Sequence, residues 1–337
     1  MAHDLRIVDG KASMFYVGTP PWHGLGTHLE KPPTAAEAIR AANLDWEVRR
    51  VPLYACEGLN NCRVPRQYAI VPSFAWGKQN CPIFGMVSEN YQPLQNQDAF
   101  GFFDPIVEQN EATYHTAGAL GKGERIWVLA ELPAPIRIIG DDLAQKFLLL
   151  SNSHDGGSAV QIKFTPIRVV CQNTLTMALE RGPTLRVAHH SNMNERLKQA
   201  ASILATVSAR FAEIEKAFQT MVRVQVSSDR LREYLAQVFP DPEPTNTVTP
   251  RYARALAHAQ DQRRWSAELF EGGAGNRIKG VPGTLWAAYN GVTEMVDHQD
   301  YGFGANRRLF NVWFGTGYSV KARAYNVAIE KMTQWRN

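Results

Sequence analysis

Apolar residues in the middle of the chain form short strand-like runs that are separated by turn residues. The runs Phe147–Leu150 and Ala159–Phe164 flank Ser151–Gly157, a polar segment that contains Asp-Gly and Gly-Gly. These dipeptides favour hairpins because a tight turn needs residues that tolerate positive φ. Upstream, residues 114–138 predict another hairpin, which turns at Gly121-Lys122-Gly123. The pattern therefore predicts a four-stranded antiparallel sheet, with a helix after it that packs across the sheet.

The N-terminal part of the chain predicts less regular structure. Residues 1–30 show no helical or strand period and predict an irregular arm, which lies over its own domain or over a neighbouring subunit. Residues 34–42 predict a short helix, in which Thr34 and Glu37 have the spacing of a capping box. Alternation over residues 46–87 then predicts a meander of strands.

A cluster of aromatic residues follows the predicted meander. Asn96 is expected to cap a helix, and four aromatic side chains lie in or just before it: Tyr91, Phe100, Phe102 and Phe103. Such rings can stack on bases of a single strand. At helical spacing we expect them in the core instead.

The C-terminal part of the chain shows helical periods, beginning with the helix expected from about Asn173. The clearest lies within residues 192–222, where apolar or small residues recur at alternating steps of three and four: Leu197, Ala200, Leu204, Val207, Phe211, Ile214, Phe218 and Met221. This heptad seam must be buried against another helix, in the same chain or in another subunit. Further helices are predicted from Ser227 or Ser228 and over residues 250–270, 284–296 and 318–333.

Together these elements predict the α+β class. The N-terminal and central region is expected to be antiparallel and β-rich, with hairpins followed by a helix packed on the sheet. The C-terminal region is expected to be helical and to contain the long heptad-patterned helix. We predict an N-terminal arm over residues 1–30, a β-rich core domain over residues 31–190 and a helical, basic region over residues 191–337.

Several sequence motifs resemble those of a known family. They are RVVCQNTL, the HDG turn, AGALGKGERIWVLAELP and the early PWHGLG, with TLWAAYNGVTEMVDH and NRRLFNVWFGTG further on. The chain resembles the phage/plasmid-like protein family from about Trp22 to Trp335. The resemblance implies an origin in phages, prophages or conjugative plasmids. It implies no particular activity, because the biochemistry of this family was not assigned when it was named.

Composition and charge narrow the classes of function. The chain has no run of about 18 apolar residues and its first residues lack the apolar core of a secretory signal, so a cytoplasmic protein without a membrane partner is expected. Residues 1–150 carry a net charge of −3 and residues 151–337 a net charge of +7, so a basic face is expected in the second half. The four cysteines have poor spacing for zinc and are expected to be structural or incidental.

The sequence contains two candidate enzyme sites, a glycine-rich loop and a group of His and Asp residues. The loop GGAGNRIKGVPG is glycine-rich and basic, but it lacks the order of residues of a phosphate-binding loop, so we expect a flexible connector. His154 and Asp155, with His115 as a further ligand, are candidates for a metal site. An Asp before two glycines is also ordinary turn chemistry, which is the interpretation we favour for Asp155.

Nucleic-acid binding depends on basic side chains that follow a strand and on aromatic rings that stack on bases. Tyr114 and Trp127 lie on adjacent predicted strands of the central sheet. The candidates for phosphate contacts come from that sheet and from the C-terminal region: Lys122, Arg125, Lys163, Arg168, Arg263, Arg264, Arg277 and Lys279. Hairpins followed by a helix also resemble in outline the core of phage single-strand annealing proteins, an analogy of topology alone.

The sequence therefore predicts a DNA-binding protein of a mobile genetic element. In its most concrete form this is a non-catalytic homo-oligomer that binds or anneals single-stranded DNA and needs no cofactor. One alternative is a metal-dependent enzyme that acts on nucleic acid or nucleotides through His115, His154 and Asp155. Another is a protein that binds and inhibits a host defence factor through the heptad helix.

Overall fold

The fold was determined from a computed structural model, which describes residues 4–21, 24–58, 60–78, 81–168, 184–189, 193, 207–243, 249–298, 311–313 and 315–335. The chain forms two compact units. Unit 1 comprises residues 1–133, 147–164 and 183–206, and unit 2 comprises residues 134–146, 165–182 and 207–337. Within the described residues, no helix has the length and apolar character that crossing a bilayer requires. The mixed α+β class is confirmed, with antiparallel sheets in the N-terminal and central region and helices in the C-terminal region.

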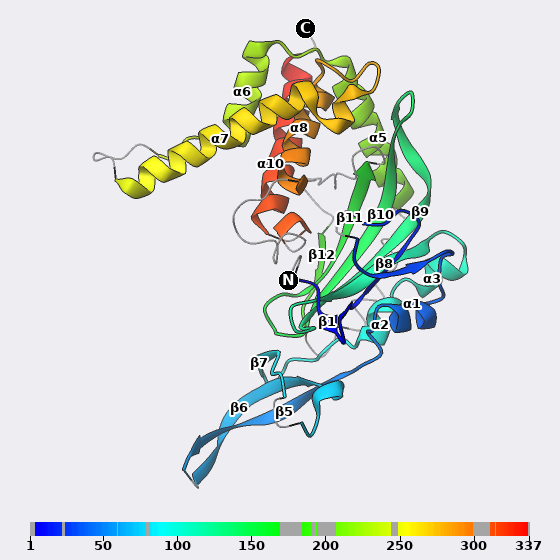
Figure 1. Ribbon diagram of the computed structural model, residues 1–337, viewed down its shortest axis with the longest axis vertical. Helices are drawn as coiled ribbons and strands as arrows, with labels where there is room; N and C mark the ends of the chain where they lie inside the picture. Colours follow the sequence, from blue (N-terminus) through cyan, green and yellow to red (C-terminus); the bar gives the residue numbers. More distant parts are fainter. Residues whose placement is uncertain are drawn as a thin grey trace. The chain divides into compact units, whose positions relative to one another are not determined.

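A seven-stranded sheet runs through the central region, with strand order β12-β11-β10-β9-β8-β3-β4 (Figure 1). Its four central strands are the predicted ones: β8 (Thr113–Leu120), β9 (Arg125–Ile139), β10 (Asp142–Ser153) and β11 (Val160–Arg168). β12 (Thr184–Val187) pairs antiparallel with β11, in a segment for which the sequence pattern predicted no strand. The predicted turn conformations are confirmed, since Gly121, Gly123 and Gly156 all have positive φ.

The N-terminal segment differs from its prediction. Where an irregular arm was expected, β3 (Met14–Val17) pairs antiparallel with β8, and β4 (Thr27–Leu29) pairs parallel with β3. The short strands β1 (Ile7–Val8) and β2 (Lys11–Ala12) form a hairpin before them. Each strand is too short to show a clear period, and the edge of the sheet supplies the hydrogen bonds that order it. Of the two alternatives, the segment lies over its own domain.

A separate three-stranded sheet forms where the meander was predicted. It consists of β5 (Val48–Glu57), β6 (Asn60–Pro72) and β7 (Gly85–Ser88), in the order β5-β6-β7. β7 pairs only with the inner part of β6, from Gln67 to Ile70. β5 and β6 continue beyond it as a two-stranded ribbon (Figure 1). We refer to residues 48–88 as the ribbon.

Short helices accompany the sheets of unit 1. The capping box of α1 (Ala35–Ala41) is confirmed, because the backbone N–H of Glu37 donates to Thr34 and that of Thr34 donates to Glu37. α2 (Asn96–Gly101) and α3 (Asp104–Glu108) replace the single helix that was predicted, and the four aromatic residues around them are buried as expected. Asn96 does not cap α2, since the N-cap position belongs to Gln95.

Unit 2 contains α5 (Val207–Arg223), α6 (Ser228–Val238), α7 (Pro250–Gly272), the 3₁₀ turn η3 (Ala274–Arg277), α8 (Leu285–His298) and α10 (Thr316–Gln334). The described part of the heptad seam is buried within this unit, since Phe218 contacts the rings of Trp286, Tyr289 and Tyr325. It therefore finds its partners in the same chain. The seam before Val207, the helix from Asn173 and the motif NRRLFNVWFGTG fall wholly or largely outside the described residues.

α8 is almost entirely buried and carries charged groups into the helical core. The Lys321 ammonium of α10, whose side chain is 0% exposed, donates to Asp297 of α8 at 2.7 Å. Burial lowers the pKa of Lys321, and the Asp297 carboxylate acts against that lowering. Removing one partner from such a buried pair leaves an uncompensated charge.

We expect Lys321→Met to destabilise the protein by about 3–5 kcal/mol, because Asp297 is left charged in the core. Replacing both partners, in Lys321→Met with Asp297→Leu, should recover most of that loss. Urea unfolding followed by circular dichroism measures both variants. A single variant as stable as the wild type would contradict this role of the pair.

Candidate nucleic-acid interface

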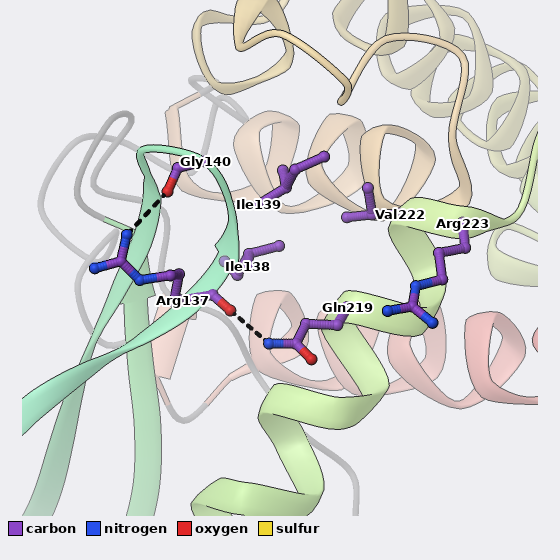
Figure 2. A pocket seen from close by; sticks show the side chains of 7 residues that line it. All are labelled: Arg137, Ile138, Ile139, Gly140, Gln219, Val222 and Arg223. Carbon is purple, nitrogen blue, oxygen red and sulfur yellow. Dashed lines mark hydrogen bonds between the residues drawn. The ribbon is translucent and has the colours of Figure 1, made fainter.

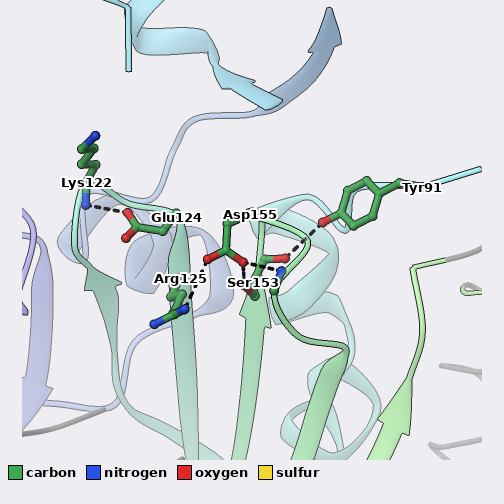
Figure 3. A network of polar contacts seen from close by, with 7 residues as sticks. Tyr91, Lys122, Glu124, Arg125, Ser153 and Asp155 are labelled. Carbon is green, nitrogen blue, oxygen red and sulfur yellow. Dashed lines mark hydrogen bonds and ion pairs between the residues drawn. The ribbon is translucent and has the colours of Figure 1, made fainter. Parts of the chain in front are cut away.

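The turn between β10 and β11 is held by the carboxylate of Asp155 (Figure 3). Its Oδ1 accepts hydrogen bonds from the backbone N–H of Gly157, at 2.6 Å, and from the hydroxyl of Ser153, and its Oδ2 lies 3.3 Å from Nη2 of Arg125. The Tyr91 hydroxyl donates to the Ser153 carbonyl at 3.1 Å. Burial raises the pKa of that hydroxyl, and Asp155 raises it further. Asp155 therefore has the turn-forming role that the sequence favoured.

His154 is a neutral, fully buried core residue. Its Nε2 lies 3.0 Å from Oδ1 of Asn96, whose Nδ2 donates to the carbonyls of Leu44 and Trp46. The Asn96 oxygen must then accept, so Nε2 of His154 carries the proton. Burial lowers the pKa of His154 to about 3, with a further lowering by His189 and an opposing effect of Asp155.

The three candidate metal ligands are buried or bound to other protein groups. His115 lies at an irregularity in β8, with its ring 4.9 Å from that of Phe147, and burial lowers its pKa to about 4. His154 uses Nε2 on Asn96, and Asp155 uses both carboxylate oxygens on the turn. The structure describes His115, His154 and Asp155, and within the described ranges no three His, Cys, Asp or Glu side chains are grouped for a metal ion.

The predicted phosphate contacts of the central sheet are mostly engaged within the protein. Arg125 is paired with Asp155, and Lys163 is only 6% exposed. Lys122 is exposed, but its backbone N–H donates to Glu124 at the same turn (Figure 3). The rings of Tyr114 and Trp127 are each 1% exposed, so neither ring is available to a base.

The predicted contacts in unit 2 are dispersed in a similar way. Arg263 donates to the Phe239 carbonyl and pairs with Asp241 at 2.6 Å, so it binds the end of α6. Arg264 pairs with Asp261 on its own helix. Arg277 donates to the Gly272 carbonyl at 3.2 Å, Lys279 is exposed, and the side chain of Arg168 lies outside the described residues. The eight candidates are divided between two units. Five of them bind protein groups or lie at acidic neighbours, and Lys163 is buried.

Another basic feature of unit 2 is a pocket of about 390 Å³ between the β9–β10 turn and α5 (Figure 2). Arg137 and Arg223 lie at it, and Ile138, Ile139 and Val222 provide apolar lining. Nη1 of Arg137 donates to the Gly140 carbonyl, and Nε2 of Gln219 donates to the Arg137 carbonyl at 2.9 Å. The first bond lies within the turn, and the second holds the turn against α5. Arg137 therefore has a structural role here.

The ribbon contains basic residues that the sequence analysis did not select. Residues 48–88 carry five basic side chains and one acidic one, Glu57, for a net charge of +4: Arg49, Arg50, Arg63, Arg66 and Lys78. The remainder of residues 1–150 carries −7, so the count over half the chain concealed this segment. A count over each predicted element would have shown it.

The ribbon also exposes large apolar side chains. Among the described residues, the large hydrophobic side chains that stand out into solvent all belong to it: Tyr54 (53%), Trp76 (58%), Ile83 (50%) and Met86 (67%). Tyr54 pairs with Arg63 across the strands, so ring and guanidinium share one face. The same register pairs Cys56 with Asn61 and Cys62 with Ala55, which places the two exposed thiols on opposite faces.

Arg50 and Arg66 fix the inner part of the ribbon. Nη1 of Arg50 donates to the carbonyls of Glu89 and Tyr91, at 2.5 and 2.9 Å, and its guanidinium lies 5.3 Å from the ring of Tyr68. Arg66 has positive φ in an irregular stretch of β6 and pairs with Glu89. In the part of the chain that the structure describes, Arg49 and Lys78 are exposed without an ion-pair partner.

These features define a mixed α+β protein that presents a basic β-ribbon with exposed rings. The family model described as "Domain of unknown function (DUF932)" matches residues 83–329, so the chain belongs to that family. Most of the ribbon, residues 48–82, precedes the matched range. No curated protein and no solved structure matches the chain.

The buried histidines predict a loss of stability in acid. Below the unfolded pKa of about 6.5, the unfolded chain binds a proton that folded His154 does not bind until about pH 3. The free energy of unfolding should fall by up to about 1.4 kcal/mol per pH unit in that window for this residue. His154→Gln retains an amide N–H for Asn96 and removes the titration. Its unfolding free energy, measured by urea titration from pH 7 to pH 4, should vary less steeply than that of the wild type, and an unchanged slope would contradict this account.

Proposed function

We propose that the protein binds nucleic acid through the ribbon, residues 48–88, and that single-stranded DNA is its ligand. The observation that carries the proposal is the combination of net positive charge and exposed rings on this one sheet. Basic side chains neutralise phosphates and release counterions, whereas rings stack on unpaired bases. The eight residues selected from sequence are not required for this interface.

The exposed rings favour a single strand over a duplex. A two-stranded β-ribbon also fits the major groove of double-stranded DNA. However, Tyr54 and Trp76 are more than half exposed, and each buries its ring more fully against an unpaired base than against the edges of a base pair. Binding and annealing of this kind are non-catalytic and use no cofactor.

The setting of this activity is part of the proposal. The sequence motifs resemble those of phage and plasmid proteins, so the strand would belong to a mobile element and the protein would act in the cytoplasm of its host. Self-association into a homo-oligomer would draw on the exposed apolar side chains of the ribbon, since the described seam of α5 is buried in its own chain. Inhibition of a host defence factor is the alternative in which the same side chains bind a protein.

The ribbon charges predict a specific dependence on salt. Three to five phosphate contacts give a slope of log affinity against log salt of about −2 to −3.5 for a single strand. Arg49→Gln with Arg63→Gln should reduce its magnitude by about 1.4 and weaken binding about 10- to 100-fold at about 50 mM salt. Fluorescence anisotropy of a labelled oligothymidine measures both quantities.

The matched control for this experiment replaces two exposed lysines in the N-terminal segment of the same unit. Lys11→Gln with Lys31→Gln changes the net charge by the same amount and leaves the ribbon intact. It should bind as the wild type does. Equal losses in both double variants would show that net charge acts alone and would contradict a role of the ribbon.

The exposed rings predict a loss of affinity that salt does not alter. Tyr54→Ala and Trp76→Ala should each weaken binding by about 1–3 kcal/mol, because a base–ring stack is lost, and leave the salt slope unchanged. Tyr54→Phe retains the ring and should retain the affinity. A Tyr54→Phe variant as weak as Tyr54→Ala would exclude stacking by this residue.

A further inference from the structure

A pocket of about 470 Å³ lies in unit 1, where β7 of the ribbon meets the β10–β11 turn. Its size is within the range of small-molecule sites in proteins, about 300–1,000 Å³. No residue of the predicted metal site or of the proposed ribbon contacts lines it. Its lining comes from three segments of the chain, residues 86–91, 156–159 and 188–189.

Five of the lining residues have a small side chain or none. Gly156, Gly157, Ser158 and Ala159 follow each other in the turn, and Ala188 lies after β12. A Cβ on Gly156 would lie 3.0 Å from Cγ1 of Val87, and the positive φ of Gly156 also disfavours a side chain. The turn that Asp155 holds therefore contributes no large side chain to the pocket.

Other lining residues carry rings and a thioether. The rings of Tyr91 and His189 are stacked, with centroids 4.7 Å apart, and Met86 of β7 also lines the pocket. His189 is fixed from both sides, because its Nδ1 donates to the Gln92 carbonyl and its own carbonyl accepts from the Gln92 N–H, each at 3.0 Å. With Nδ1 protonated, Nε2 of the neutral ring is an acceptor. A lining that combines small residues with rings and a sulfur atom suits a planar aromatic ligand.

The charged side chains lie at the border of the pocket and not in its lining. The lining contains no Lys, Arg, Asp or Glu, and Ser88 and Ser158 provide hydroxyl groups. One cation lies directly beside it, since the Arg50 guanidinium binds the carbonyl of the lining residue Tyr91, whereas Arg66 is paired with Glu89. The pocket therefore suits an uncharged ring with polar edges, and its border suits an anion.

We infer that this pocket takes one nucleobase out of the strand that the ribbon binds, with the adjoining phosphate beside Arg50. The inference rests on the proposed function, and it adds a defined base site to a ribbon that contacts bases without fixed positions. A base already unpaired enters such a site at low cost, because no base pair has to be broken.

Photocrosslinking tests the base site directly. A single-stranded oligonucleotide with one 5-iodouracil is irradiated on the full-length protein, and the crosslinked peptides are identified by mass spectrometry. We expect crosslinks at Tyr91 or His189 in addition to those at Tyr54 and Trp76. Ala188→Phe, which fills the pocket, should lower the crosslinks at Tyr91 and His189 about tenfold and weaken binding about 5- to 150-fold, the loss of one stacked base.

Two comparisons make the outcome decisive. Ala253→Phe places the same ring on the exposed face of α7 and should leave all crosslinks unchanged, and Ala159→Leu replaces Ala188→Phe if that variant does not fold. Binding with crosslinks confined to the ribbon, or undiminished crosslinks at Tyr91 and His189 in the filled pocket, would overturn this inference alone. Failure of the wild type to bind the oligonucleotide would overturn the proposed function as well.

Discussion

The hydrogen bond between Asn96 and His154 is the constraint on which unit 1 depends. The Asn96 amide binds two carbonyls just before β5 and the imidazole at the end of β10, so a single side chain joins the start of the ribbon to the β10–β11 turn. Both groups are buried, and an unsatisfied partner would cost about 1–3 kcal/mol. The rings of Trp46 and Phe84 pack around the same imidazole. A polar group in the core thus fixes where the exposed ribbon begins.

The position of each basic side chain tells more about ligand binding than the net charge of the protein does. The chain has a net charge of +4, yet many of its arginines and lysines serve the fold. Arg125 holds a turn, Arg263 binds the end of a helix and Lys321 is paired in the core. The N–H groups that these cations donate to protein acceptors are not available to a phosphate. In the ribbon, Arg50 and Arg66 also donate to protein acceptors, whereas Arg49 and Lys78 are exposed without an ion-pair partner among the described residues.

Patterns among neighbouring residues predicted caps and turns correctly. Features that depend on contacts between distant residues could not be predicted in this way. The capping box at Thr34, the Ser227 cap and the glycine turns each depend on neighbouring residues, and the structure has them. Asn96 has the composition of a cap, but a histidine 58 residues away recruits it. The strand β3 forms because β8 offers it hydrogen bonds, which no local pattern records. The ribbon was missed for a different reason. Net charge was counted over residues 1–150, where the acidic residues outside the ribbon outweigh its positive charge.

The cross-strand register of β5 and β6 has one more consequence. Cys56 and Cys62 are separated by only a few residues around the hairpin, yet they face away from each other, so they cannot close a bridge within one ribbon without a slip of register. Each thiol is therefore exposed for chemical labelling on its own face of the ribbon. A dye attached at one position samples one side of the ribbon, and a dye at the other samples the reverse side. The molecule thus carries a natural pair of attachment points for measuring which side a ligand covers.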